Sequence, residues 1–333
     1  MTIENTRRLT LLLGATMLAG IATLAPAADA ADAYPTRPIT VLVPHAAGGP
    51  TDTVARLVAE SMTRTLGQQV LVENAGGAGS TLGTARAARA EPDGYTLLLN
   101  HVAQATSATL YRKLPYDPVG AFVGIGLITD VPMTVVAKAD LKPGSIAELI
   151  AYVKAEKDKL SYAHAGVGSA SHLCGMLLMD ALDAPMTTIP YKGTGPAMTD
   201  LLGGQVDVMC DQTTNTTNQI KGGKIKAYAV TTKARLSVLP DLPTLDEAGL
   251  SGFEMTVWHG LYAPKGTSKE AIERLVPALQ AAVADPRVVE RFRDLGTEPV
   301  AAERATPAAL EGHLRAEVAK WQPVIKAAGV YAE

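Results

Sequence analysis

The stretch PITVLVPHAAGGPTD at residues 38–52 decides the fold. Its first half is a short β-branched run that ends at Pro44, which is typical of a buried strand. Its second half is a loop with two adjacent glycines, and the apolar spacing of residues 53–66 predicts a helix directly after it. A strand that leads through such a loop into a helix is the first unit of a parallel α/β sheet.

The same alternation of strand and helix continues along the chain. Before residue 120 the pattern predicts strands at 69–72 and 95–99 and a helix at 80–90. Later it predicts strands at 160–163, 188–191, 207–211 and 227–231, and helices at 145–156, 172–182, 195–202, 268–284 and 307–328. Between the two series lie extended runs at 123–128 and 133–137. We therefore expect two similar α/β lobes, with crossovers near 130–136 and 229–257.

The N-terminus predicts export. Arg7 and Arg8 precede an apolar stretch, Leu9–Leu24, and small residues follow up to Ala33. A basic start, a short apolar segment and small residues at the end are typical of a cleavable secretory signal peptide. A membrane anchor is the alternative, but glycines and threonines interrupt the stretch and no basic cluster follows it. Residues 1–33 are thus predicted to be a signal peptide, and the protein to work in the periplasm.

Composition excludes several classes of function. The 333 residues carry 30 Lys+Arg against 33 Asp+Glu, a net charge of −3, whereas nucleic-acid binding requires a basic face. Hydrophobic residues make up 47%, enough for a packed core, so general disorder is excluded. Aromatic residues make up only 5%, which argues against a site built on aromatic stacking.

Three loops follow predicted strands, at His45–Asp52, Asn100–Ser107 and His164–Ser171. In open α/β sheets, ligands bind beyond the carboxyl ends of the strands. The free N–H groups at a helix N-terminus favour an anion there. The convergence of these loops therefore predicts a binding site for a small anion.

Catalytic and cofactor motifs are weak. The glycines of residues 77–83 have the spacing G-x-G-x-x-x-G and follow the second strand, so a dinucleotide site is not expected. The Gly166–His172 segment lacks the G-x-S-x-G elbow of a hydrolase. The loop histidines show no metal-ligand spacing. We expect no cofactor, no metal and no enzymatic activity. Cys174 and Cys210 either form a disulfide or remain two buried thiols, and the sequence leaves this open.

Ordered motifs along the mature chain resemble one family. They are DAYPTRPI (32–39), VPHAAGGPTD (43–52), VENAGGAG (72–79), EPDGYTL (91–97), GVGSASHL (166–173), PYKGTGPA (190–197) and LPDLPTLDEAG (239–249). The chain resembles the solute receptors of tripartite tricarboxylate transporters, also called Bug receptors. The resemblance implies a two-lobed periplasmic binding protein of type II that closes by a hinge over a small organic carboxylate.

The resemblance also implies the lobes, the partners and the ligand-binding residues. Lobe one would comprise residues 34–131 and 233–333, and lobe two residues 132–232. The partners would be the carboxylate and the membrane subunits of a transporter, with the receptor itself a monomer. Backbone amides, hydroxyls and water would hold the carboxylate. The expected positions are Ala46, Ala47, Gly48, Asp52, Asn100, His101 and Gln104 in lobe one, and Gly168, Ser169, Ser171, Thr194 and Asp211 in lobe two.

Three histidines depart from the family pattern. His45 stands where Phe or Tyr is common, His101 lies in a loop usually rich in small residues, and His259 follows Trp258. We expect them to line the cleft and to influence specificity. Two other functions remain open: an orphan receptor that feeds a signalling protein, and a secreted hydrolase on the same fold that uses Ser169, His172 and Asp211.

Overall fold

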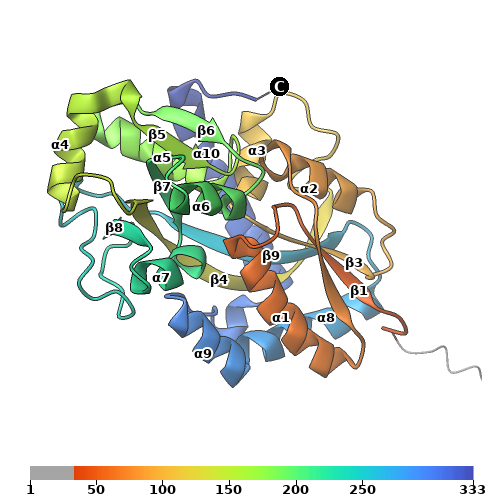
Figure 1. Ribbon diagram of the computed structural model, residues 1–333. Coiled ribbons are helices and arrows are strands. Elements are labelled where there is room, and N and C mark those ends of the chain that lie inside the picture. The colour runs from red at the N-terminus through yellow and green to blue at the C-terminus, as the bar shows by residue number, and fades with distance from the viewer. Residues whose placement is uncertain (1–33, 333) are drawn as a thin grey trace, which may run out of the picture. The chain divides into compact units, whose positions relative to one another are not determined.

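The computed structural model describes residues 34–332, which belong to one compact unit. The predicted signal peptide lies outside the described residues. The described strands form a single sheet in the order β2-β1-β3-β9-β4-β7-β5-β6, and β8 pairs with β4 beside this path (Figure 1). The strands are β1 (Ile39–Val43), β2 (Val70–Asn74), β3 (Thr96–His101), β4 (Phe122–Lys138), β5 (Ser161–His164), β6 (Thr187–Pro190), β7 (Val208–Gln212), β8 (Ile225–Val230) and β9 (Thr256–Pro264).

Strand β4 joins two sets of strands. Its residues Phe122–Pro132 pair with β9, and its residues from Met133 onward pair with β7 and β8. We call β1, β2, β3, β9 and the first part of β4, with the helices that cover them, the first lobe, and the last part of β4 with β5–β8 the second lobe. The sequence predicted two separate runs here. One strand replaces them because residues 129–132, between the two runs, also pair with β9. Its register shifts after Gly124 and again after Leu127, and such bulges bend a strand without ending it.

The expected parallel pairing holds for only part of each lobe. Strand β1 runs parallel to β2 and β3, and β5 runs parallel to β6 and β7. Strand β9 is antiparallel to β3 and β4, and β4 is antiparallel to β7 and β8. The sheet is therefore mixed, which corrects the expectation of a parallel one. The antiparallel strands are those that carry the chain from one lobe to the other.

The described helices are α1 (Pro50–Leu66), α2 (Thr81–Ala88), α3 (Ala103–Leu110), α4 (Ile146–Glu156), α5 (Ala170–Leu182), α6 (Thr194–Leu202), α7 (Thr213–Lys221), α8 (Lys269–Ala284), α9 (Pro286–Asp294) and α10 (Pro307–Ala328). Helix α1 begins three residues earlier than predicted, with a proline in its first turn, where a missing N–H costs nothing. Helices α3, α7 and α9 were not predicted. Helix α7 is rich in threonine, which disfavours helices, but the hydroxyls of Thr213, Thr216 and Thr217 donate to backbone carbonyls.

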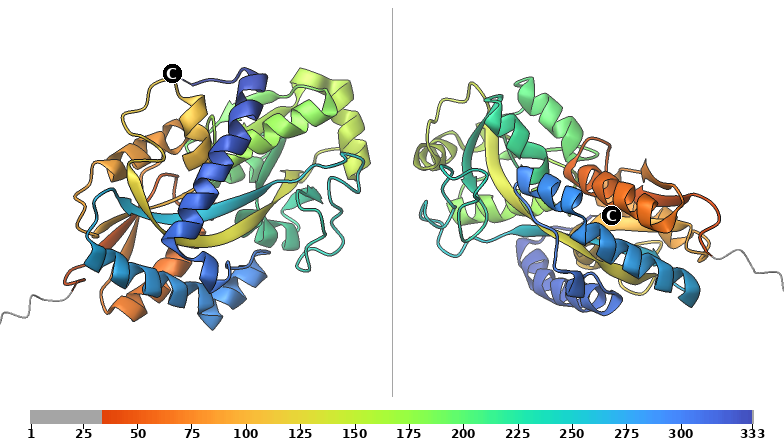
Figure 2. Two further views of the ribbon diagram at one scale, coloured as in Figure 1. Left: turned by 180° about the vertical axis from the view of Figure 1, so that it is seen from behind. Right: turned by 90° about the horizontal axis from the view of Figure 1, so that it is seen from below.

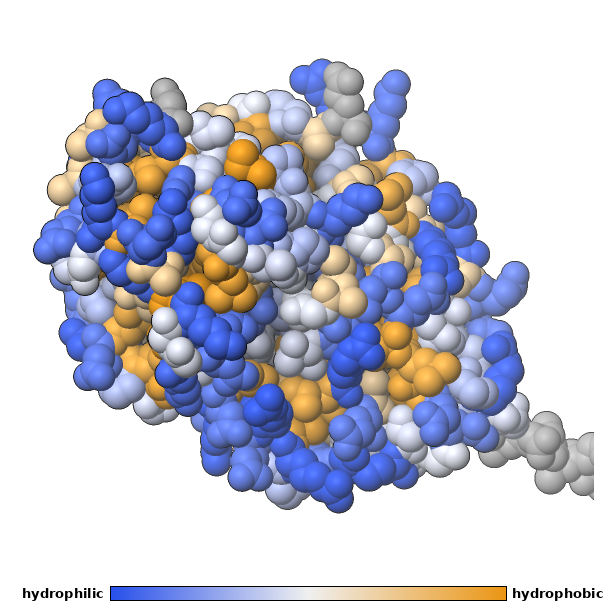
Figure 3. All heavy atoms as spheres, viewed as in Figure 1, coloured by the Kyte–Doolittle hydropathy of each residue, from blue (hydrophilic) through white to orange (hydrophobic). Residues whose placement is uncertain are grey.

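The helices cover the sheet and leave the exterior polar. Helix α10 crosses the back of β4 and β9 and packs against α3 and β4 (Figure 2). Figure 3 shows hydrophilic side chains over most of the face in view, with apolar atoms in separate patches. Among residues 34–332, no helix has the length and apolar character needed to cross a membrane.

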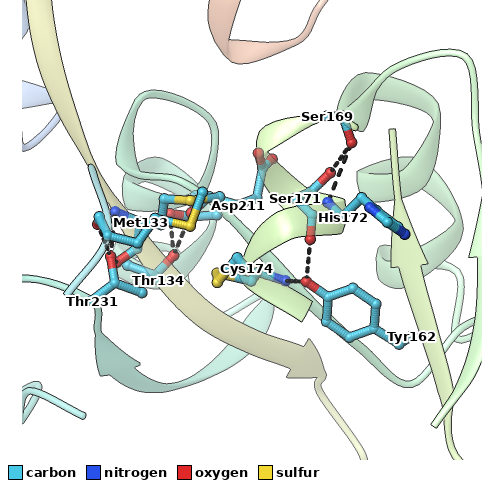
Figure 4. The surroundings of a disulfide bond; sticks show 12 residues. Met133, Thr134, Tyr162, Ser169, Ser171, His172, Cys174, Asp211 and Thr231 are labelled. Carbon is cyan, nitrogen blue, oxygen red and sulfur yellow. Dashed lines mark hydrogen bonds between the residues drawn. A yellow bond between two sulfur atoms is a disulfide. The ribbon is translucent and has the colours of Figure 1, made fainter. Parts of the chain in front are cut away.

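A disulfide joins Cys174 on α5 to Cys210 on β7, with a Cα–Cα distance of 6.1 Å (Figure 4). The two cysteines therefore form a disulfide and are not the two separate buried thiols that the sequence left open as an alternative. The bond fixes the start of α5 to the end of β7, since Cys174 lies in the second turn of the helix and Cys210 directly precedes Asp211. The disulfide thus holds the start of α5 and the end of β7 at a fixed separation.

Candidate functional site

A small buried pocket lies where strand ends and helix N-termini of both lobes meet. The first lobe contributes the turn from His45 to Thr51 and the end of β3 at His101. The second lobe contributes the starts of α5 and α6 and the end of β7. The lining residues are His45, Ala46, Gly49, Pro50, Thr51, His101, Ala165, Ser169, Ala170, Ser171, Thr194, Asp211 and Gln212. The cavity measures about 20 Å³, which is room for about one water molecule.

Four helices direct their N-terminal turns at this pocket: α1, α5, α6 and α7. Ser169 caps α5 by accepting a hydrogen bond from the His172 N–H at 3.2 Å. The N-cap residues of α1, α6 and α7, which are Gly49, Gly193 and Gln212, make no side-chain cap hydrogen bond. Uncapped N–H groups and the helix dipoles favour negative charge. The pocket is therefore suited to a carboxylate, and its lining contains no lysine or arginine.

Three histidines cluster on the side of the first lobe, where His45 and His101 line the pocket and His259 lies behind His101. The rings of His45 and His101 stack with centroids 4.4 Å apart, and His259 meets His101 edge to face at 5.7 Å. The Nδ1 atom of His101 accepts a hydrogen bond from the Ala103 N–H, so the ring carries its proton on Nε2. All three rings are buried, and burial lowers the pKa of His45 to about 4 and of His259 to about 3. The cluster is therefore neutral at pH 7.

Serine hydroxyls and a tyrosine organise the wall on the side of the second lobe. The Ser171 hydroxyl accepts from the Ala165 N–H at 2.9 Å and lies 3.2 Å from the Ser169 hydroxyl. Beneath them, the Tyr162 hydroxyl donates to the Ser171 carbonyl and accepts from the Cys210 N–H (Figure 4). These bonds fix the first turn of α5 against β7, so its N–H groups have a constant direction.

Asp211 is the one carboxylate among the lining residues, and it is only 1% exposed. Its Oδ2 atom accepts from the Asn215 amide at 2.5 Å, whereas Oδ1 has no partner. Burial raises the pKa of Asp211 to about 6, although hydrogen bonds from Asn215, from the Gln212 N–H and from the Thr194 hydroxyl oppose this shift. Beside it, the Oε1 atom of Gln212 is also buried without a partner. Two acceptors therefore face the pocket unsatisfied.

Replacing Asp211 with asparagine is expected to stabilise the free protein at pH 7.5 by about 1–2 kcal/mol, part of the roughly 3 kcal/mol that two pKa units represent. The pKa of Asp211 in the folded state, about 6, lies above its ordinary 3.8, so stability is lost as the pH rises between these values. Urea unfolding measures the gain, which should vanish near pH 4. Asp180→Asn, the same charge change at an exposed position of α5, is the control. A destabilised Asp211→Asn protein at pH 7.5 would contradict the prediction.

The predicted ligand-binding residues are only partly brought together. His45, Ala46, His101, Ser169, Ser171, Thr194 and Asp211 line the pocket. Ala47 and Gly48 lie at its exposed rim, Gly168 lies in the turn before α5, and His259 lies behind His101. Asp52, Asn100 and Gln104 have other bonding partners within the first lobe.

Hydrogen bonds within the first lobe explain why the side chains of Asp52, Asn100 and Gln104 do not line the pocket. Asp52 accepts hydrogen bonds from Arg56 and from the Gly48 N–H. Burial alone would raise the pKa of Asp52, but these hydrogen bonds lower it by more, so its pKa lies below the usual range. The Asn100 amide donates to Gln104, which in turn donates to the Pro118 carbonyl. These side chains shape the loops of the first lobe. The lining residues that the sequence analysis missed are Gly49, Pro50, Thr51, Ala165, Ala170 and Gln212. The position of Gln212, directly after Asp211 at the end of β7, was the available signal.

The hydrolase arrangement is not assembled. A nucleophilic serine needs a hydrogen bond to an imidazole that acts as base. Ser169 instead bonds to the His172 backbone N–H and to Ser171, and the His172 ring accepts from the Gly168 N–H at 3.3 Å. Asp211 bonds to Asn215 rather than to a histidine. Among residues 34–332 there is also no group of three or more His, Cys, Asp or Glu side chains arranged to hold a metal ion.

A larger groove, of about 780 Å³, lies elsewhere, between the middle of β4 and the segments 235–238 and 296–301. Three arginines line it, but each has an acidic partner: Arg235 with Glu247, Arg293 with Glu298 and Arg304 with Asp130. Exposed pairs of this kind contribute little free energy and leave no charge unsatisfied. The small pocket is the better candidate for the ligand-binding site because it has buried polar atoms without hydrogen-bond partners.

Two α/β lobes, joined by long strands and facing each other across a pocket of helix N-termini, define a solute-binding protein of the periplasmic type. Residues 54–330 match the family described as "Tripartite tricarboxylate transporter family receptor". The chain belongs to this family of periplasmic solute-binding receptors, as its sequence motifs indicated.

Similar proteins and solved structures are consistent with this family assignment. A protein of Agrobacterium vitis, described as "UPF0065 protein in the TAR-I ttuE-ttuC' intergenic region", is 55% identical over 98% of this chain and 92% of its own length. The solved structure of periplasmic binding protein BugD is 55% identical, covers 90% of this chain and 100% of its own, and has a TM-score of 0.88. MatC from Rhodopseudomonas palustris, solved with malate, is 41% identical with a TM-score of 0.84 over 88% of this chain and 100% of its own. A second R. palustris protein, solved with adipate, is 32% identical with a TM-score of 0.85 over 90% and 99%.

Proposed function

We propose that the protein is a non-enzymatic periplasmic receptor that binds a small organic carboxylate in this pocket and delivers it to the membrane subunits of a tripartite tricarboxylate-type transporter. The observation that carries the proposal is the set of uncapped helix N-termini from both lobes around one buried pocket. Carboxylate ligands in two family members, malate and adipate, support it. Residues 1–33 would be the cleaved export signal, and the receptor would act as a monomer without a cofactor.

We further propose that ligand entry requires the two lobes to separate, because a cavity of about 20 Å³ has no room for an organic acid. The hinge would lie where β4 exchanges β9 for β7 at Pro132 and Met133, and in the returning segment between β8 and β9. With this hinge, the proposed lobes are residues 34–131 with 233–333, and residues 132–232. Movement about a few residues at the ends of elements is the usual mode of such closure.

A thermal-shift screen of the purified protein tests the binding function. A ligand at one hundred times its Kd adds about 2.7 kcal/mol of stability, which raises the Tm of a chain of this size by roughly 5 °C. Mono-, di- and tricarboxylates are compared with their neutral amides, which keep the shape but lack the charge. We expect at least one acid to shift the Tm and its amide to leave it unchanged. The absence of a shift with every acid, or equal shifts with acids and amides, would refute a carboxylate receptor.

A further inference from the structure

Threonine hydroxyls join the two lobes outside the strands that connect them. Three of these hydroxyls donate to backbone carbonyls of the opposite lobe at 3.1 Å: Thr106 to Gly168, Thr213 to Gly296 and Thr217 to Leu295. All three side chains are fully buried. Among residues 34–332, no ion pair crosses from one lobe to the other. Neutral hydrogen bonds, and not ion pairs, therefore hold this boundary.

The three bonds lie next to residues that line the pocket. Gly168 directly precedes Ser169, and Thr213 directly follows Gln212. Ser169 is the N-cap of α5 and Gln212 is the N-cap of α7, so the bonds attach two helix starts of the second lobe to the first lobe. Since donor and acceptor lie on different lobes in each bond, separation of the lobes breaks all three.

Helix α7 connects this boundary to the pocket. Its Asn215 amide donates to the pocket residue Asp211, whereas Thr213 and Thr217, one turn apart, donate to the first lobe. The sequence TTNTTN at 213–218 is unfavourable for a helix, because its side chains compete for backbone hydrogen bonds. Here the same side chains bond to the pocket and to the opposite lobe, so α7 can transmit the state of one to the other.

The strength of these bonds suits a reversible closure. When the lobes close, each hydroxyl exchanges a hydrogen bond with water for one with the opposite lobe, which is favourable by a modest amount. Each bond therefore shifts the balance between open and closed lobes only severalfold. Three bonds together shift it by more than about tenfold, provided that their contributions add.

We propose that Thr106, Thr213 and Thr217 are positioning residues for ligand capture, and that their hydroxyls form an uncharged clasp that holds the lobes closed over the pocket. The inference rests on the proposed function and deepens it, because it names the contacts that retain a bound acid. None of the three residues lines the pocket. The clasp therefore acts through the separation of the lobes and not through a contact with the ligand.

Threonine-to-valine variants test the clasp, because valine keeps the shape of threonine and lacks the hydroxyl. We expect Thr106→Val, Thr213→Val and Thr217→Val each to weaken binding of the acid found in the thermal-shift screen at least about threefold, and the triple variant at least about thirtyfold. The loss should lie in the dissociation rate, with the association rate changed less than about twofold, because the clasp forms after the acid has entered. Calorimetric titration and stopped-flow kinetics measure the affinity and the two rates.

Two further variants separate the clasp from a merely structural role. Thr217→Ser keeps the hydroxyl and should dissociate at the native rate. Thr216→Val is the matched control, because Thr216 is equally buried on α7 but bonds within the second lobe, to the Thr134 hydroxyl and the Gln212 carbonyl. It should lower the free energy of unfolding and leave the dissociation rate unchanged.

The outcomes for the clasp and for the receptor function are distinct. Native dissociation rates in the triple variant, or equal acceleration in Thr216→Val, would overturn the clasp and leave the carboxylate receptor intact. The three single variants decide the question if the triple variant does not fold. A native protein that binds none of the acids overturns the receptor function and the clasp with it.

Discussion

Acidification from pH 7 to pH 4.5 is expected to lower the free energy of unfolding by at least about 3 kcal/mol, because the buried histidines must take up protons on unfolding. The pKa values of His45 and His259, about 4 and about 3, lie below the ordinary 6.5. The pKa of His101 is also well below 6.5, because burial and its two histidine neighbours oppose its charged form. A lowered histidine pKa means that stability is complete above pH 6.5 and declines as the pH falls towards the pKa of the folded state.

The size of the loss combines opposing contributions. At pH 4.5, His45 and His259 together remove about 5 kcal/mol, at about 1.4 kcal/mol for each pKa unit traversed. Asp211 acts in the opposite direction, because its pKa of about 6 means that protonation relieves a buried charge, and it returns about 2 kcal/mol over the same range. These three groups together give a net loss of about 3 kcal/mol, and His101, His164 and His172, whose pKa values burial also lowers, add to it. Even this minimum is a large share of the 5–15 kcal/mol that a domain usually has.

Urea unfolding between pH 7.5 and pH 4.5 measures this loss. The slope of unfolding free energy against pH reports the protons gained on unfolding, about 1.4 kcal/mol per pH unit for each proton. His45→Phe keeps an aromatic ring to stack on His101 but cannot be protonated, so it should reduce the slope between pH 6 and 5 by about one proton. An unchanged slope in His45→Phe, or equal stability at pH 7 and 4.5, would contradict the role of the cluster.

The fold was predictable where local pattern and tertiary packing agree. Strand β1 and the loop after it were read correctly because the β-branched run and the two glycines leave few alternatives. Helix α7 was missed because its threonines disfavour a helix unless the rest of the protein supplies hydroxyl acceptors. The single strand β4 was missed because Asp130 and Pro132 interrupt its apolar run between the two predicted segments. Both exceptions depend on neighbours far away in the sequence.

The location of the candidate pocket could be predicted from the sequence, but the hydrogen bonds of its polar side chains could not. Strand-end loops indicated Ser169, Ser171 and Asp211, and the structure puts all three at the pocket. The same reasoning included Asn100 and Gln104, whose amides bond to each other instead. Which polar side chains already have a hydrogen-bond partner depends on the tertiary structure. The three histidines are far apart in the sequence, and strand pairing brings them together. The pairing of β3 with β9 sets His259 opposite His101, and the pairing of β1 with β3 brings the loop that carries His45 beside the same ring.

Close backbone contacts between the lobes depend on glycine. Gly195, at the start of α6 in the second lobe, lies against the backbone of Ala47, Gly48 and Gly49 in the first lobe. A Cβ atom at position 195 would lie 2.8 Å from the Ala47 carbonyl oxygen, and none of its nearest neighbours belongs to its own lobe. A side chain there would therefore hinder the approach of the lobes without disturbing the packing within either one.

Gly195→Ala is consequently expected to weaken binding of the ligand at least one hundredfold, or about 2.7 kcal/mol, because the pocket forms only when the lobes meet. Stability without ligand should be unchanged or up to about 1 kcal/mol higher, since alanine favours a helix more than glycine does. Gly195→Val should abolish binding. The measurements are calorimetric titration with the acid found in the screen and thermal unfolding of the free protein. Gly312→Ala, on α10 with open space around the added Cβ, is the matched control and should bind normally. Native affinity in Gly195→Ala would show that ligand binding does not require this contact between the lobes.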